Sequence, residues 1–134
     1  MKKYIIVLIL FLTSCIYDPA PAIIEVVNHT DHNINILWNI DTVPEYPSIN
    51  HTEYYYSNVL LVNDTLDAME NGASGWKRFL LNSKNKKVNF FVFSADSLKA
   101  HNSIDDLILK RLYKRLEYSE EDLIKSNWQV VIKD

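Results

Sequence analysis

The chain has 134 residues, a formal net charge of −3 and a single cysteine. A chain of this length favours one domain that can bury a single core. The acidic balance argues against a nucleic-acid partner. One cysteine excludes a disulfide framework within the chain and a metal site built from cysteines.

The first fifteen residues follow the order of a secretion signal. Residues 1–3 include two lysines, residues 4–12 form an apolar run, and residues 12–15 read Leu-Thr-Ser-Cys. A helix that spans a bilayer needs roughly 20 apolar residues, so this run fits the apolar part of a signal peptide better. An ordinary signal peptide followed by a chance cysteine is the alternative.

This segment resembles a bacterial lipoprotein signal with its lipobox. The resemblance implies that residues 1–14 are removed, that Cys15 carries lipid, and that the lipid anchors the chain to a membrane. Ile16 follows the cysteine, where an aspartate would favour the inner membrane, so we expect the outer membrane of the cell envelope, on its periplasmic side or at the cell surface. Residues 15–22 read as a short tether with two prolines, and residues 23–134 as one domain.

Two strands are expected at the start of the domain. Residues 23–28 are mostly apolar, and residues 34–40 place Ile34, Ile36, Trp38 and Ile40 at every second position. This period of two predicts a strand with one buried face. The polar residues 28–33 between them are typical of a turn, so we expect a hairpin.

The middle of the chain is expected to be rich in loops. Residues 41–53 contain two prolines and read as a loop, and Tyr54–Val62 is a candidate third strand because aromatic and β-branched residues favour strands. Residues 76–81 fit a short helix or a strand equally well. Residues 88–93 are almost continuously apolar, which predicts a central strand covered on both faces.

The last third of the chain predicts helices and a final strand. Asp96 is expected to cap a brief helical turn that ends at His101. Ser103–Leu116 carries an apolar stripe at helical spacing, and residues 119–122 resemble a capping box for a second helix. Trp128–Lys133 reads as a strand. The predicted fold is α+β, an antiparallel sheet of about five strands with one amphipathic helix on it; a sandwich with a helical insertion is the alternative.

The C-terminal part supports a family resemblance. Residues 91–98 read as a strand that ends in an Asp-Ser-Leu turn, and residues 114–115, 118–123 and 127–128 complete the pattern with Lys-Arg, Tyr-Ser-Glu-Glu-Asp-Leu and Asn-Trp. This pattern resembles a group of small lipoproteins of unknown function from Bacteroides and relatives. The resemblance covers about half of the mature chain and implies the same compartment. It transfers no catalytic residue.

Charge and aromatic residues suggest a binding function. No lysine or arginine occurs from residue 16 to residue 75, while nine acidic residues do. Aromatic side chains beside acids are typical of glycan sites, and a glycan or an envelope protein is the expected partner. The alternatives are that the two halves neutralise each other and that the aromatics pack in the core. The candidate binding residues are Tyr46, Tyr54, Tyr56 and Trp76.

Metal, cofactor and catalytic motifs are weak. His29 and His32 flank Asp31, but a polar turn explains them better than a zinc site, which needs three or four ligands. The acids Asp41, Asp64, Asp67 and Glu70 lack the calcium-loop pattern. No nucleophile elbow, zinc-protease pair or phosphate loop occurs in the sequence. We therefore expect no cofactor, no metal and no catalytic residue.

Two short motifs concern modification. Thr42 and Thr65 each follow an aspartate and precede an apolar residue, which is similar to sites where Bacteroides attaches O-glycans to exported proteins. The expected function is a non-enzymatic binding or accessory lipoprotein. A small envelope glycan hydrolase and a protective inhibitor are the alternatives.

Overall fold

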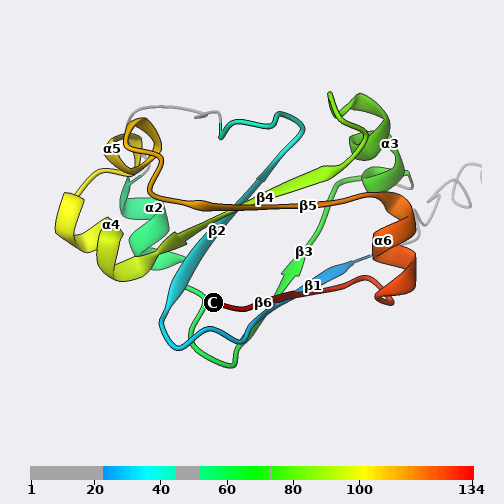
Figure 1. The fold of residues 1–134 in the computed structure, drawn as a ribbon. Coiled ribbons are helices and arrows are strands. Elements are labelled where there is room, and N and C mark those ends of the chain that lie inside the picture. Colours follow the sequence, from blue (N-terminus) through cyan, green and yellow to red (C-terminus); the bar gives the residue numbers. More distant parts are fainter. Residues whose placement is uncertain (1–22, 45–51, 73) are drawn as a thin grey trace, which may run out of the picture.

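The computed structural model describes residues 23–44, 52–72 and 74–134. Within them the chain forms six strands and five helices (Figure 1). The elements are, in order, β1 Ile24–Asn28, β2 Ile34–Asn39, α2 Thr52–Ser57, β3 Thr65–Ala68, α3 Gly75–Asn82, β4 Val88–Ser94, α4 Ala95–His101, α5 Ile104–Leu109, β5 Lys114–Tyr118, α6 Glu120–Lys125 and β6 Gln129–Ile132. The predicted α+β class is confirmed.

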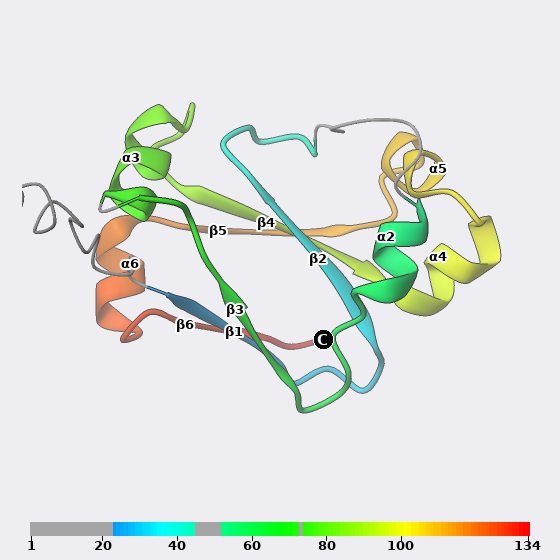
Figure 2. The same ribbon diagram turned by 180° about the vertical axis from the view of Figure 1, so that it is seen from behind.

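The strands form two sheets of three, so the predicted single sheet of about five strands with one helix is wrong. One sheet has the order β3-β1-β6, with β1 antiparallel to β3 and parallel to β6. The other has the order β2-β4-β5 and is antiparallel throughout. Figures 1 and 2 show the two sheets facing each other, with α2, α4 and α5 at one end and α3 and α6 at the other.

The strand β4 is the centre of the fold, as its apolar sequence predicts. Phe90 and Val92 point into the core between the two sheets, where they meet Val26 of β1 and Val130 of β6. Phe91 and Phe93 point the other way. They pack in a second core with Tyr55 of α2, Leu98 of α4 and the α5 residues Ile104 and Leu107. Both faces of β4 are therefore buried.

The predicted hairpin between the first two strands is wrong, because β1 and β2 lie in different sheets. Buried Asn28 holds the turn between them. Its Nδ2 donates to the carbonyl oxygens of His32, Leu60 and Leu61, and its Oδ1 accepts from the backbone N–H and the hydroxyl of Thr30. These bonds direct the chain from one sheet to the other instead of folding it back.

The predicted strand Tyr54–Val62 is also wrong, because residues 52–57 form the helix α2. The cause is a contact with distant residues. Asn35 of β2 donates through Nδ2 to the carbonyl oxygens of Tyr55 and Asn58, at 2.6 and 2.9 Å, and so satisfies the C-terminal end of the helix. Tyr55 packs on Phe93, with ring centroids 6.5 Å apart.

The predicted helix Ser103–Leu116 is correct only in its first half. Ser103 caps α5, but Arg111 adopts φ 55°. The N–H of Arg111 bonds to the carbonyl of Ile108, and the N–H of Leu112 bonds to that of Leu107. This is the Schellman arrangement that ends helices. The chain then forms β5, where Leu116 faces the core between the sheets.

The remaining predictions mostly agree with the structure. Residues 76–81, left open between helix and strand, belong to α3. The cap of α4 is Ser94 rather than Asp96. The capping box of α6 forms between Ser119 and Asp122, as predicted. In the final strand Val130 and Ile132 are buried, and half-buried Trp128 precedes β6 with φ 60°.

Candidate functional site

The predicted binding residues that the structure describes do not come together in one place. Tyr46 and the lipidation candidate Cys15 lie outside the described residues. Tyr54 is 59% exposed and Tyr56 is 37% exposed, but on α2 they point in different directions: Tyr56 donates its hydroxyl to Asn102 of the α4–α5 corner. Trp76 is 2% exposed and belongs to the core between the sheets.

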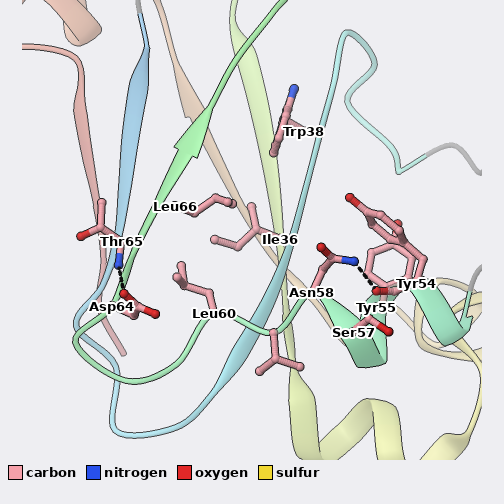
Figure 3. A pocket seen from close by; sticks show the side chains of 11 residues that line it. Ile36, Trp38, Tyr54, Tyr55, Ser57, Asn58, Leu60, Asp64, Thr65 and Leu66 are labelled. Atoms are coloured by element: carbon pink, nitrogen blue, oxygen red, sulfur yellow. Dashed lines mark hydrogen bonds between the residues drawn. The ribbon is translucent and has the colours of Figure 1, made fainter.

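Tyr54 lines a groove between β2 and β3, which are edge strands of the two sheets (Figure 3). We name it the β2–β3 groove. The groove has a volume of about 280 Å³. The side chains of Ile36, Leu60 and Leu66 form its apolar part, and Tyr54 and Asn58 of the α2 region form one wall. Trp38 closes one end, and Asp64 and Thr65 lie at the other.

Trp38 is held in a fixed position at this groove. Its Nε1 donates to Oε1 of Glu70 at 2.9 Å. Its ring lies 6.4 Å from Trp76 and 6.4 Å from Phe90, in tilted contacts within the core. One face of the ring therefore rests on the core, and a glutamate beyond β3 fixes its orientation.

The walls of the groove are held by the two buried asparagines. Asn35 fastens the end of α2 to β2, and Asn28 fastens the loop at Leu60 and Leu61 to the β1–β2 turn. Leu60 also forms a single β-bridge with Ile34. Both asparagines are buried and bond to main-chain carbonyls, so they fix α2 and the Leu60 loop on either side of the groove.

The groove lies entirely in the part of the sequence without lysine or arginine. All its lining residues fall between positions 36 and 66. Among the described residues, Lys84 with Asp41 and His32 with Asp134 are the ion pairs that join the two halves of the chain. The pairs Lys87–Glu117, Arg115–Glu117, Lys110–Asp106 and Lys125–Glu121 all lie in the second half. Among the described residues no ion pair to Asp64 is found, so the groove has a negative charge at its rim.

The candidate modification sites differ in setting. Thr65 is exposed at the start of β3, and its N–H bonds to the side chain of Asp64 at 2.9 Å. Thr42 is half-buried in a loop, and its carbonyl accepts from Arg115 at 2.9 Å. Thr65 therefore lies in a strand and Thr42 in a loop.

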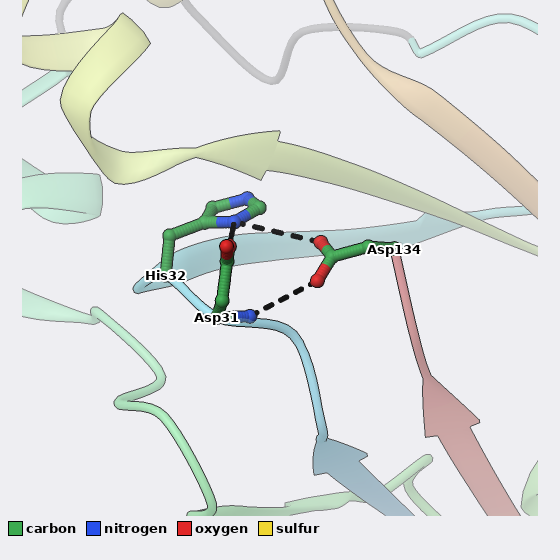
Figure 4. A group of neighbouring side chains, drawn as sticks. All are labelled: Asp31, His32 and Asp134. Carbon is green, nitrogen blue, oxygen red and sulfur yellow. Dashed lines mark hydrogen bonds and ion pairs between the residues drawn. The ribbon is translucent and has the colours of Figure 1, made fainter.

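A second cluster of polar groups gathers at the β1–β2 turn (Figure 4). Nδ1 of His32 lies 2.9 Å from Asp31 and 3.6 Å from Asp134, which follows β6. The three possible ligand atoms lie within 4.8 Å of one another. The sequence indicated His32 and Asp31, whereas Asp134 arrives through the parallel pairing of β1 with β6. His29 is not part of this cluster.

A third cluster joins α4 to α5. Nδ1 of His101 lies 2.5 Å from Asp106, which also accepts from Lys110 at 2.8 Å. These hydrogen bonds, that of Lys110 first, lower the pKa of the Asp106 carboxyl. Lys110 and His101 thus hold a carboxylate at the corner between two helices. The contacts have a structural role, because Asp106 also lies in the first turn of α5.

The comparisons with known proteins add no relative. No family model matches the chain, and neither a curated protein nor a solved structure matches it significantly. None of the helices in the described residues has the length and apolar character needed to cross a bilayer. The function is therefore argued from the groove and from the sequence.

Proposed function

We propose that the protein is a lipoprotein of the bacterial cell envelope, anchored to the outer membrane through Cys15, and that its folded part binds a partner in the β2–β3 groove without chemical turnover. The order of lysines, apolar run and Leu-Thr-Ser-Cys in residues 1–15 supports the anchor. The resemblance of residues 91–128 to small Bacteroides-type lipoproteins supports the same compartment.

The observation that carries the binding proposal is the pair of aromatic side chains at the groove. Tyr54 is exposed on one wall, and Trp38 is held in place by Glu70 at one end. Rigid aromatic side chains supply much of the energy at binding hot spots, because they bury large areas at a small entropic cost. A partner seated on Ile36 and Leu66 would contact both rings.

Tyr54 and Tyr56 provide a matched test, because both are exposed tyrosines of the same helix and only Tyr54 lines the groove. Full-length protein in native membranes would be cross-linked to its neighbours, and the purified full chain would be applied to a glycan array. We expect Tyr54→Ala to lose the ligand at least tenfold and Tyr56→Ala to keep it. Equal loss in both variants, or turnover of a bound glycan, would contradict the proposal.

The anchor is tested separately from the groove. Metabolic labelling with a fatty-acid analogue should mark the wild-type chain and leave Cys15→Ser unmarked. If both chains are labelled equally, Cys15 is not the lipid attachment site. Since Cys15 lies far outside the groove residues in sequence, Cys15→Ser should still bind any ligand that the glycan array or cross-linking identifies.

A further inference from the structure

The strand β2 has an unpaired edge that faces the β2–β3 groove. β4 pairs with it on one side. On the other side, Ile34 exchanges two backbone hydrogen bonds with Leu60, at 3.0 and 2.8 Å. In an antiparallel ladder every second residue directs its N–H and C=O to the same side, so Ile36 and Trp38 direct theirs away from β4. No strand of the described residues pairs with them.

The chain itself pairs with this edge at a single residue. Leu60 extends the sheet beyond β2 for one residue, and then the chain turns away toward β3. The backbone groups of Ile36 and Trp38 continue the same row, next to the apolar side chains of Leu60 and Leu66. Main-chain groups in such a row give affinity for an extended peptide, and neighbouring pockets select its side chains.

The charge of the groove indicates which kind of extended segment could pair with β2. Asp64 lies at one end, without an ion pair among the described residues, and all lining residues come from the segment without lysine or arginine. A second copy of this chain would bring the same acidic edge to the interface and be repelled. An extended segment with lysine or arginine at alternate positions would be attracted.

We propose that the β2–β3 groove binds an extended, basic segment of another protein, which adds to β2 as a fourth strand of its sheet. The backbone of the segment pairs with Ile36 and Trp38, its apolar side chains pack on Leu60 and Leu66, and its cations approach Asp64. This inference rests on the proposed binding function, because it names the ligand class of the same groove.

The test uses the full chain in detergent and an array of synthetic nonapeptides. In one set Val, Ile, Leu or Thr alternates with Lys or Arg; in the matched set Glu replaces the cations. We expect the basic set to be retained and the acidic set to be lost. On binding, hydrogen exchange of the Ile36 and Trp38 amides should slow at least tenfold. The amide of Leu37, on the β4 side, should not change.

Two variants separate backbone pairing from charge. Ile36→Pro removes one edge N–H and spares the bonds to β4, since edge strands tolerate proline where the N–H faces out; we expect at least a tenfold loss of peptide affinity. Thr65→Lys adds a cation at the groove and should weaken the basic peptides severalfold. Gln129→Lys, on β6 at the other edge of the β3-β1-β6 sheet, is the control for Thr65→Lys and should bind the peptides normally. This pair of variants still tests the role of charge if Ile36→Pro fails to fold.

Several outcomes would overturn the inference. They are retention of both peptide sets alike, retention of neither, and binding without protection of the Ile36 and Trp38 amides. Protection that appears with protein concentration alone would assign the edge to a second copy of the chain. If only an oligosaccharide binds and Tyr54→Ala abolishes it, the groove function stands and the peptide inference fails.

Discussion

Asn35 and Tyr55 are joined by a 2.6 Å hydrogen bond from the buried side-chain amide to the main-chain carbonyl at the end of α2. The same amide also donates to Asn58. A strand residue thus terminates a helix that lies 20 residues later in the sequence. This side chain therefore helps to hold the wall of the β2–β3 groove that carries Tyr54, together with the packing of Tyr55 on Phe93.

Replacing Asn35 by Leu should therefore destabilise the fold. The carbonyl oxygen of Tyr55 would keep the N–H of Asn58, at 3.3 Å, and the part-buried carbonyl oxygen of Asn58 would lose a donor. Each lost hydrogen bond costs about 0.5–1.5 kcal/mol. Urea unfolding of both chains would measure the difference in the free energy of unfolding. Asn58→Ala is the control: its exposed amide also bonds to α2, at Tyr54, and its loss should cost less. A silent Asn35→Leu would show that α2 does not need this cap.

Truncation of Trp76 should lower stability far more than truncation of Tyr54. Trp76→Ala removes a buried ring from the core between the sheets, and such changes cost about 3–5 kcal/mol. Tyr54→Ala removes an exposed ring and should stay within about 0.5 kcal/mol of the wild type. Thermal unfolding of the two variants would show this contrast. A stable Trp76→Ala would contradict the packing described for α3.

Arg111→Gly should stabilise the protein. Arg111 is exposed and holds φ 55° at the end of α5. A left-handed conformation costs a residue with a Cβ about 1–2 kcal/mol, which exceeds the entropic cost of glycine, about 0.5–1 kcal/mol. Chemical denaturation should show a gain of about 0.5–1 kcal/mol. Arg111→Val, with a β-branched side chain, should lower stability; a gain there would refute the strain argument.

The capping box of α6 should make part of the stability depend on pH. The hydroxyl of Ser119, 2.6 Å away, and its N–H, at 2.9 Å, lower the pKa of the Asp122 carboxyl. A lowered folded-state pKa means that this stabilisation is fully present above the ordinary carboxyl pKa of about 3.9. It is lost as the pH falls through the folded-state value.

Asp122→Asn is the matched variant, since an amide oxygen can still accept from Ser119. Thermal unfolding of both chains between about pH 3 and pH 7 should show the wild type more stable at neutral pH. The difference should shrink as the solution becomes acidic. A constant difference across this range would mean that the charge of Asp122 does not strengthen the capping box.

The parts of the fold that could be predicted have a local cause. The continuous apolar run of β4 and the Ser119 capping box can each be recognised from residues that are neighbours in the sequence. The end of α5 is not, because helices commonly end on glycine and this chain has only two. Here Arg111 takes that position, and the apolar spacing continues past it into β5 without a visible break.

The groove could be predicted only in its charge. Its walls come from edge strands of two different sheets and from the helix α2. The tyrosines of α2 favour a strand in the sequence, so the helix was not predicted. Trp38 looks like an ordinary residue on the buried face of β2, and its partner Glu70 lies 32 residues away. The sequence indicated the groove only through the absence of lysine and arginine from residues 16–75, which include all of its lining residues.

The parallel pairing of β1 with β6 has a consequence for how the chain is made. Glu25 of β1 and Gln129 of β6 are hydrogen-bonded neighbours separated by 104 residues. During synthesis β1 leaves the ribosome long before its partner exists, and pairing over such a separation is slow. The β3-β1-β6 sheet is therefore completed last, and in a chain that stops before residue 129 one edge of β1 stays unpaired.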